Sequence, residues 1–299
     1  MTPGYAEDRS AVFEQFRHRL FAVAYRMMGT RADAEEIVQE AYLRWHRADT
    51  RDIRSAEAWL VTVVTRLSID RLRKAAVERE AYTGPWLPEP LFGHPAPSPE
   101  EELELAEALS MAFMVLLERL APVERAAFLL HDIFDCAYPE IARILAKSEA
   151  ACRQIVHRAR ERVHHGSSRF QVDGDDHRRL IERFVEATNA GDEATLLSLF
   201  AEDATLTSDG GGVVFAARKV VHGRALIARL FLTVKRRRGE RFTQLILPIN
   251  GEPGLVSFMD GVPFSATSFE TDGRRILALY NVLNPEKLKG IDRLEDKAG

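Results

Sequence analysis

The spacing of apolar residues predicts helices over the first part of the chain. From residue 13 to about residue 79, apolar side chains recur every three or four positions and no proline interrupts them. In DAEEIVQEAYLRW, residues 33–45, the apolar positions form one stripe that ends at Trp45. The other faces are polar and largely acidic, which predicts an amphipathic helix. A polar stretch at 46–55 follows, and AWLVTVVTRLSIDRLRK at 58–74 resumes the helix.

A proline-rich segment interrupts the helical pattern at residues 82–98. It contains GPWLPEP at 84–90, which cannot run as a helix because proline lacks the backbone N–H and clashes with the preceding turn. An unfolded spacer is normally polar, since exposed apolar groups gain nothing. We therefore expect Trp86 and Leu87 to anchor this segment against another part of the protein. The segment ends in a capping box made by Ser98, Pro99 and Glu101.

Four further helical segments are expected between residues 99 and 165. The last two, PEIARILA at 139–146 and EAACRQIVHRARERV at 149–163, are separated only by Lys147 and Ser148. The second of them is basic, and Ser148 is a suitable N-cap for it. Two helices joined by so short a turn are the sequence form of a helix-turn-helix.

The pattern changes after residue 165. A linker at 166–175 precedes a helix at about 176–189, a Gly-Asp turn, and a second helix through Phe200. Strand-like runs then occupy 204–208, 244–249, 255–260, 263–270 and 275–283, with one more helix at about 224–232. NGEPG and TDG are hairpin-type turn sequences. We expect an α+β domain in which a curved sheet of antiparallel strands wraps around helices.

Length and composition indicate a multidomain protein of ordinary soluble type. The chain has 299 residues, 46% of them hydrophobic, which suits two or three domains. The longest apolar runs fall far short of the roughly 20 residues of a membrane-spanning helix, and the start MTPGYAEDRS lacks the features of a signal peptide. We therefore expect a cytoplasmic protein without membrane contact. Cys136 and Cys152 lack zinc-site spacing, and the sequence indicates neither a metal nor a cofactor.

Net charge is a poor guide to the partners of this chain. Residues 1–165 sum to −4 and residues 166–299 to zero, values that do not suggest a nucleic-acid-binding protein. Cations nevertheless gather at two places. Arg66, Arg71, Arg73 and Lys74 lie at one end of the predicted 58–74 helix, and Arg153, Arg158, Arg160 and Arg162 lie along the predicted 149–163 helix.

The second helix of a helix-turn-helix lies in the major groove of DNA, with its N-terminal residues at base edges. Ser148, Glu149, Arg153 and Gln154 are placed to read bases, whereas His157, Arg158 and Arg160 are placed to meet phosphates. A solvated helix in a bundle would explain the arginines but leave the abrupt turn unexplained. Trp45 and Trp59 lie on apolar stripes and are expected in the core, where they could not stack on bases.

These three motifs, in this order and separated by a linker, resemble the two helical domains of an extracytoplasmic-function sigma factor. The resemblance covers about the first half of the chain. It implies that Glu36, Gln39 and Glu40 bind the clamp helices of the large subunit of bacterial core RNA polymerase. It also implies that the 46–55 loop and the helix with Arg66, Arg71 and Arg73 engage the minus-ten promoter element. The 149–162 helix would then read the minus-thirty-five element.

The C-terminal half resembles SnoaL-like domains, a cone-shaped α+β fold shared with polyketide cyclases and ketosteroid isomerase. WLPEP in the linker, SDGGG at 208–212 and NPEKL at 284–288 are similar to motifs of the sigma-factor subgroup with a fused SnoaL-like domain. In that subgroup the fused domain regulates the sigma factor in place of a separate anti-sigma protein. The implied regulatory contact comprises Trp86, Leu87, Pro88, Asp209, Gly210, Gly211, Gly212, Asn284, Pro285 and Lys287.

Two positions depart from the motifs of this subgroup. Val213 stands where a lysine usually follows DGGG, and the nearest cations are Arg218 and Lys219. If that lysine makes an ion pair between domains, this chain must use another contact or do without it. Glu286 replaces the commoner aspartate. Without the resemblance, the three glycines would read as a flexible turn and Pro285 as a chain stop.

The resemblance to isomerases raises the question of an enzyme. Catalysis on this fold needs a carboxylate base and a hydrogen-bond donor in an apolar pocket. Asp203, Asp209 and Asp260 show no evident pairing with Tyr280, and His177 and His222 are too few for a multi-histidine metal site. We therefore expect a regulatory domain, with an unidentified small molecule as one candidate signal. The alternatives are a helix-turn-helix regulator that works without polymerase and a transcription factor fused to an isomerase or cyclase.

The expected organisation has five parts. They are a region-two domain at 1–81, the proline-rich linker at 82–98, a helix-turn-helix domain at 99–165, a linker at 166–175 and the SnoaL-like domain at 176–299.

Overall fold

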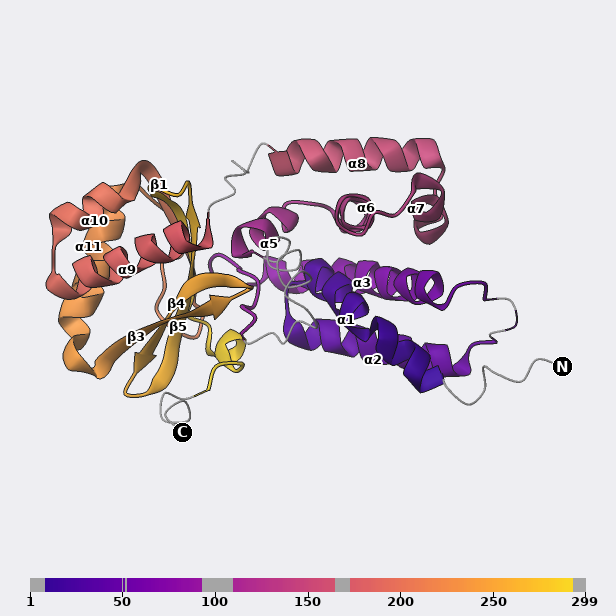
Figure 1. Cartoon of the computed structure of the whole chain (residues 1–299), viewed down its shortest axis with the longest axis horizontal. Coiled ribbons are helices and arrows are strands. Elements are labelled where there is room, and N and C mark those ends of the chain that lie inside the picture. Colours follow the sequence, from indigo (N-terminus) through magenta and orange to yellow (C-terminus); the bar gives the residue numbers. More distant parts are fainter. Residues whose placement is uncertain (1–8, 50, 52, 93–109, 165–172, 293–299) are drawn as a thin grey trace. The chain divides into compact units, whose positions relative to one another are not determined.

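The computed structural model describes residues 9–49, 51, 53–92, 110–164 and 173–292. The chain forms two compact units (Figure 1). Unit 1 comprises Met1–Glu80 and Leu116–Ser167, and unit 2 comprises Ala81–Val115 and Ser168–Gly299. The expected capping box at Ser98, Pro99 and Glu101 lies outside the described residues. None of the described helices is long and apolar enough to cross a membrane.

The first half of unit 1 consists of α1 (Arg9–Met28), α2 (Arg31–Arg47) and α3 (Ala56–Glu80). The gap between α2 and α3 falls in the predicted polar stretch at 46–55, whereas the break between α1 and α2 was not predicted. Gly29 adopts a φ of +75°, and the side chain of Thr30 caps α2 by accepting a hydrogen bond from the backbone N–H of Asp33 at 3.4 Å. Because glycine adopts positive φ without strain, the chain can turn here.

A pair of tryptophans lies at the core of this half. Trp45 is 2% exposed, and its indole Nε1 donates to the carbonyl of Arg9 at 3.0 Å. The ring of Trp59 lies 5.5 Å from that of Trp45. The structure thus places Trp45 in the core, as predicted, whereas Trp59 is only half-buried against it.

The second half of unit 1 contains the helix-turn-helix. Its elements are α6 (Pro122–Phe128), the π-helical turn η2 (Leu129–Ile133), α7 (Tyr138–Leu145) and α8 (Glu149–His164), preceded by α5 (Met111–Leu117) at the unit boundary. Ala146 ends α7 with a φ of +52°, and the hydroxyl of Ser148 accepts from the N–H of Ala151 at 3.2 Å. The Ser148 cap is therefore present, and the turn spans residues 146–148.

From residue 173 onward, the described part of unit 2 combines three helices with a six-stranded sheet (Figure 1). The helices are α9 (Gly174–Ala190), α10 (Glu193–Leu199) and α11 (Arg224–Arg238). The strands, in the order β2-β1-β6-β5-β4-β3, are β1 (Phe200–Asp209), β2 (Val221–His222), β3 (Phe242–Ile249), β4 (Glu252–Met259), β5 (Val262–Thr271) and β6 (Ile276–Val282). Short 3₁₀ turns, η3 (Gly239–Arg241) and η4 (Pro285–Leu288), precede β3 and follow β6.

The sheet is mixed, which corrects the expectation of antiparallel strands alone. β3, β4, β5 and β6 form an antiparallel meander, but β1 pairs with β6 in parallel. After β1 the chain forms β2 and α11 and then the four strands of the meander. The last of these strands, β6, lies beside β1. Period-two alternation shows that a segment is a strand but does not reveal the direction of its neighbour. β2, with only two residues, has no such pattern.

The sheet has a separate apolar core on each face. On one face Phe184 of α9 lies 5.0 to 6.0 Å from the rings of Phe200, Phe231 and Phe269. On the other face Val256, Phe258 and Val282 pack with Leu87 from the proline-rich segment. The segment before α5 therefore supplies part of the core of unit 2.

Candidate functional site

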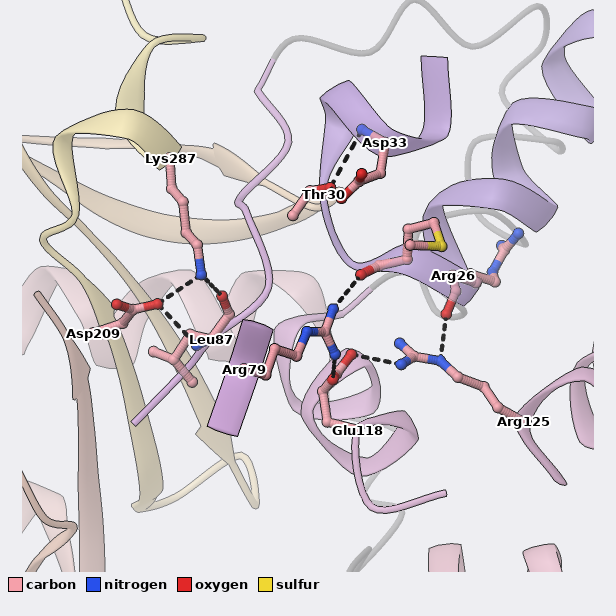
Figure 2. Close-up of polar contacts among 10 residues, drawn as sticks. Arg26, Thr30, Asp33, Arg79, Leu87, Glu118, Arg125, Asp209 and Lys287 are labelled. Carbon is pink, nitrogen blue, oxygen red and sulfur yellow. Dashed lines mark hydrogen bonds and ion pairs between the residues drawn. The ribbon is translucent and has the colours of Figure 1, made fainter. Parts of the chain in front are cut away.

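The first candidate site is the contact between residues 82–92, hereafter the linker strip, and the end of β1. Asp209 is fully buried there, and its carboxylate accepts hydrogen bonds from the Tyr82 hydroxyl at 2.6 Å and from the Leu87 backbone N–H at 2.9 Å. The ammonium of Lys287 lies 2.8 Å from the same carboxylate and also donates to the Leu87 carbonyl (Figure 2). One buried ion pair thus binds both backbone groups of Leu87.

Aromatic and amide groups complete this contact. The Lys287 ammonium lies 4.0 Å from the centroid of the Trp86 ring and 5.2 Å from that of Tyr82, distances suited to cation–π attraction. Asn284 donates from its amide to the Tyr82 hydroxyl at 3.0 Å. Burial, with the adjacent Asp209 carboxylate, raises the pKa of Tyr82, so this hydroxyl remains a donor at neutral pH.

The far end of the linker strip adds a second anchor. Leu91 exchanges two hydrogen bonds with Asn250, at 2.8 and 2.9 Å, and Phe92 forms a β-bridge with Ile249. Leu87 and Leu91 are 1% and 5% exposed, Pro88 is buried, and Trp86 is half-buried. The structure thus places Trp86, Leu87 and Pro88 beside Asp209, Asn284 and Lys287.

Each of the three positions after Asp209 requires glycine for its own steric reason. A Cβ on Gly210 would lie 2.5 Å from the carbonyl oxygen of Val214, and one on Gly211 would lie 2.5 Å from the Asn284 amide nitrogen. Gly211 and Gly212 adopt φ values of +63° and +74°. The Gly211 N–H also donates to Asp209 at 3.0 Å. Val213 is 71% exposed. The cation of this contact comes instead from Lys287, whereas Pro285 is exposed.

We expect Gly211→Ala to destabilise unit 2 by about 1 to 2 kcal/mol for the positive φ plus about 1 to 3 kcal/mol for overpacking against Asn284. Gly191→Ala is the matched control, because Gly191 has a φ of +73° but nothing within 4 Å of its would-be Cβ. Chemical denaturation of both variants separates the two contributions. Equal losses of stability would show that the contact between Gly211 and Asn284 is loose.

The second candidate site is the outer face of α8. Arg153, Gln154, His157 and Arg158 are exposed and line one shallow hollow. Arg153 is held in place because it pairs with Glu149 at 3.0 Å and lies 5.2 Å from the centroid of the Tyr138 ring. Buried Cys152, Val156 and Ala159 fix the opposite face of the helix. Ser148 is used as the helix cap.

Acidic residues of unit 1 hold several cations of α8. Both oxygens of the Asp132 carboxylate accept from Arg160 Nε, at 3.0 and 3.1 Å, and this pairing raises the pKa of Arg160. Glu124 lies 3.8 Å from Arg158 and also pairs with Arg162. The sequence predicts that these arginines meet phosphates, but it does not reveal the carboxylates that pair with them in the protein. Those carboxylates belong to α6 and η2, which are distant from α8 in sequence.

The predicted cations of α3 have different surroundings. Arg66 donates to the carbonyls of Ile144 and Arg143, at 2.9 and 3.0 Å, and so caps the end of α7. Arg71 pairs with Asp33 at 2.9 Å. Arg73 and Lys74 are exposed, the former 3.3 Å from Asp70. On α2, Glu36 and Gln39 are exposed, while Glu40 is half-buried and lies 2.8 Å from Arg44.

Sequence reasoning missed a buried arginine cluster that joins the two halves of unit 1 (Figure 2). The Arg125 side chain is 2% exposed and donates to the Arg26 carbonyl at 2.7 Å and to Glu118 at 2.6 Å. Arg79 pairs with the other oxygen of Glu118 and donates to the Met28 carbonyl at 2.7 Å. We call Arg79, Glu118 and Arg125 the arginine latch. No local sequence signal marked this cluster, because Arg79 on α3 is distant in sequence from Glu118 and Arg125.

The carboxylates considered for catalysis have different surroundings. Asp203 is exposed, Asp209 is in the linker contact, and Asp260 pairs with Arg241. Tyr280 donates to Glu270 at 2.8 Å, a partner that sequence reasoning did not consider.

The two histidines considered for a metal site also differ in their surroundings. His177 is buried, which lowers its pKa, and bonds to the carbonyl of Pro253 at 3.1 Å, while His222 is exposed. Within the described ranges, no three His, Cys, Asp or Glu side chains are grouped to hold a metal.

Comparison with known proteins identifies relatives of both units. The family Sigma-70 region 2 matches residues 12–77, and the family Sigma-70, region 4 matches residues 110–163. The chain is 41% identical over 299 residues to ECF RNA polymerase sigma factor SigJ of Mycobacterium tuberculosis, covering 96% of this chain and 95% of that protein.

A second relative and a solved structure agree with this result. The chain is 30% identical over 287 residues to probable ECF RNA polymerase sigma factor SigI of the same species, covering 93% of this chain and 94% of that protein. The crystal structure of M. tuberculosis SigJ matches with a TM-score of 0.76 at 38% identity, covering 94% of this chain and 98% of that one.

Proposed function

Since the chain belongs to the family of extracytoplasmic-function RNA polymerase sigma factors, we propose that it directs bacterial core RNA polymerase to promoters under the control of its own C-terminal domain. The carrying observation is the buried contact of Asp209 and Lys287 with Leu87. The linker strip lies between the two sigma-factor regions in sequence, and this contact attaches it to the C-terminal domain. A change in that domain can therefore act on the connection between the promoter-binding regions.

The exposed acidic face of α2 is our candidate for the polymerase contact. Glu36 and Gln39 are exposed, and Glu40 needs only to exchange its partner Arg44. Such a surface pair contributes about 0.3 to 0.5 kcal/mol, so the exchange costs little. The buried Ile37, Val38 and Ala41 fix the orientation of this face.

α8 is our candidate for recognition of the minus-thirty-five element. Arg153 and Gln154 lie on its first two turns, where a recognition helix meets base edges. Arg153 suits guanine, because its guanidinium can donate to both O6 and N7. His157, Arg158 and Arg160 follow on later turns, and the last two would exchange Glu124 and Asp132 for phosphates. Glu149, which pairs with Arg153, would have to release it.

Promoter binding requires unit 1 to open. The minus-ten and minus-thirty-five elements are about 25 base pairs apart, which is roughly 85 Å of B-DNA at 3.4 Å per step. Our candidates for the minus-ten contact are Arg66, Arg71, Arg73 and Lys74. The Nε of Arg66 lies 2.9 Å from the carbonyl oxygen of Ile144, near the end of α7. The described conformation cannot place both regions on their elements. It is therefore a resting state, and polymerase binding favours an open one.

The C-terminal domain acts here as a regulator. We infer that a signal, for which an unidentified small molecule is one candidate, shifts the equilibrium between a docked and a released linker strip. The cone interior supports this inference over catalysis, because its described core is formed by Phe184, Phe200 and Phe269. A catalytic base in an isomerase lies in an apolar pocket beside a donor, whereas Tyr280 and Glu270 pair with each other.

Run-off transcription tests the proposal. We expect the full chain with bacterial core polymerase to initiate at its own upstream promoter, and a chain ending at Ser168 to give a different yield at equal polymerase. A higher yield makes the C-terminal domain an inhibitor, and a lower yield makes it a required part. If neither protein initiates while the free chain binds the DNA tightly, the chain is a regulator that works without polymerase.

Arg153→Gln provides the control for promoter reading in the same assay. Loss of a two-donor base contact costs about 1 to 3 kcal/mol, so initiation at the cognate promoter should fall about 5- to 150-fold. Binding to unrelated DNA should change little. Lys147→Gln, in the preceding turn, is expected to leave promoter selection intact.

A further inference from the structure

The zero net charge of residues 166–299 conceals a strongly basic segment. Residues 210–239 contain eight Lys or Arg and no Asp or Glu, whereas the remainder of 166–299 contains eleven Lys or Arg and nineteen Asp or Glu. Six of the eight cations belong to α11, a helix of 15 residues. They are Arg224, Arg229, Lys235, Arg236, Arg237 and Arg238.

α11 presents three of these arginines on its outer surface. Ile227 and Ala228 are fully buried against the domain core, and the 3.6-residue period puts Arg229, Arg236 and Arg237 on the opposite side. All three are exposed. Arg238, in contrast, is directed inward, with its guanidinium 3.9 Å from the centroid of the Phe264 ring. The helix therefore has a packed side and a cationic outer face.

On other helices some exposed arginines, such as Arg119 and Arg178, form no ion pair with a described carboxylate, whereas several others pair with a carboxylate one turn away. Examples are Arg31 with Glu35 at 2.8 Å, Arg44 with Glu40 at 2.8 Å and Arg153 with Glu149 at 3.0 Å. Among the side chains that the structure describes, which do not include that of Glu240, Arg229, Arg236 and Arg237 form no ion pair with a carboxylate. Helix stability does not explain this composition, since a helix without acidic residues gains no pairs of this kind.

The helix dipole explains only part of the arrangement. Cations are favourable in the last turn, which accounts for Lys235 to Arg238. Arg224, however, is in the first turn, where a cation is unfavourable, and Arg229 is in the middle, where the dipole has little effect. A polyanionic partner accounts for the exposed Arg229, which the dipole does not explain.

We propose that the outer face of α11 binds the phosphate backbone of duplex DNA beside the minus-thirty-five element. The inference rests on the proposed function, because it requires the chain to be at a promoter. Arg229 and Arg236 are two helical turns apart, about 10.5 Å, close to three base-pair steps of about 3.4 Å. Eight residues, 165–172, separate α8 from the next described part of unit 2, and a chain of eight residues spans at most about 30 Å. With α8 bound to the minus-thirty-five element, the start of α9 therefore lies within roughly nine base pairs of that element.

Other occupants fit this surface less well. Leu226 and Leu230 are 57% and 40% exposed, and two leucines are too little apolar area for a membrane-binding helix. A second copy of α11 would bring arginines against arginines. An acidic protein surface would use the two leucines as anchors, so these residues distinguish a protein partner from DNA.

The test measures promoter affinity of the holoenzyme, full chain with bacterial core polymerase, between 50 and 200 mM salt. The variant carries Arg229→Gln, Arg236→Gln and Arg237→Gln, and the matched control carries Leu226→Ser and Leu230→Ser. Each lost phosphate contact reduces the slope of log affinity against log salt by about 0.9. We therefore expect wild type to lose about 40-fold more affinity than the arginine variant over this range, and the leucine control to match wild type.

The DNA fragment supplies the second comparison. On a fragment that ends at the upstream edge of the minus-thirty-five element, wild type and the arginine variant should have the same salt dependence. Equal slopes on the long fragment would overturn the proposal, and so would weaker binding of the leucine variant to core polymerase. Failure of the wild-type holoenzyme to prefer its promoter over scrambled DNA would instead refute the proposed function.

Discussion

Lys287→Met is expected to release the linker strip and to lower the thermal stability of unit 2 by about 10 °C. Lys287 and Asp209 have side-chain exposures of 8% and 0%, and their charges are 2.8 Å apart. Removal of one partner from a buried ion pair costs about 3 to 5 kcal/mol, because the remaining charge stays buried. For a unit of this size, each kcal/mol corresponds to about 2 to 4 °C. Leu87 would lose the donor to its carbonyl, and Trp86 would lose its cation.

Trp86 fluorescence and calorimetry measure this result. The tryptophan emission should shift toward that of solvent-exposed indole, and initiation should change in the same direction as in the chain ending at Ser168. Lys289→Met is the control, because Lys289 pairs with Glu286 while both are about two-thirds exposed. Addition of Asp209→Asn to Lys287→Met should restore part of the stability, since it removes the unpaired charge. If the Lys287→Met protein unfolded at the same temperature as the Lys289→Met protein, the buried ion pair would be refuted.

Local sequence signals were sufficient for most elements of this fold. Apolar periodicity predicts α2 and α3, and the Ser148 cap marks the start of α8, because these features depend on residues within a few positions of one another. The 15-residue α11 extends to Arg238, six residues beyond the predicted end near residue 232. Its last turns are cationic, and no apolar stripe marks them. The parallel pairing of β1 with β6 depends on the path of the intervening chain and has no local signal.

The linker contact shows what composition can and cannot reveal. Two apolar residues in a proline-rich segment predict docking, because an exposed spacer gains nothing from them. The partner of Leu87 is Asp209, 122 positions away, and no pattern within a helix or strand encodes that separation. The resemblance to a known family indicated the three motifs, while Tyr82 and Asn250 were found only in the structure.

The same limit applies to the arginine latch. Arg125 resembles an ordinary surface arginine in the sequence, but it is 1% exposed because α6 packs against α1. Burial lowers the pKa of Arg79, and the Glu118 carboxylate offsets part of that effect. A buried guanidinium group, that of Arg125, and a half-buried one, that of Arg79, thus share the Glu118 carboxylate. This arrangement is favourable only while Glu118 is charged and in place, so it is suited to a contact that must open.

Glu118→Gln is therefore expected to open unit 1 in the free protein. The glutamine has nearly the same shape but removes the carboxylate that Arg79 and Arg125 share. Removal of one partner from a buried pair costs about 3 to 5 kcal/mol, and the 18% exposure of Glu118 favours the lower end. About 3 kcal/mol raises the population of the open state roughly 100-fold relative to the closed one. Initiation should increase when core polymerase is limiting and remain unchanged when it is saturating.

Energy transfer between dyes on α2 and α8 measures the opening directly. Glu35→Cys and Glu161→Cys provide exposed labelling sites, whereas Cys136 and Cys152 are buried and burial raises the pKa of the Cys136 thiol to about 11. Transfer efficiency should be lower in Glu118→Gln than in Glu14→Gln, which alters an exposed pair with Arg17. Unchanged helical circular dichroism would distinguish opening from unfolding. Equal transfer in the two variants would show that the latch does not hold the promoter-binding regions together, because the loss of its only carboxylate would then have left the closed state intact.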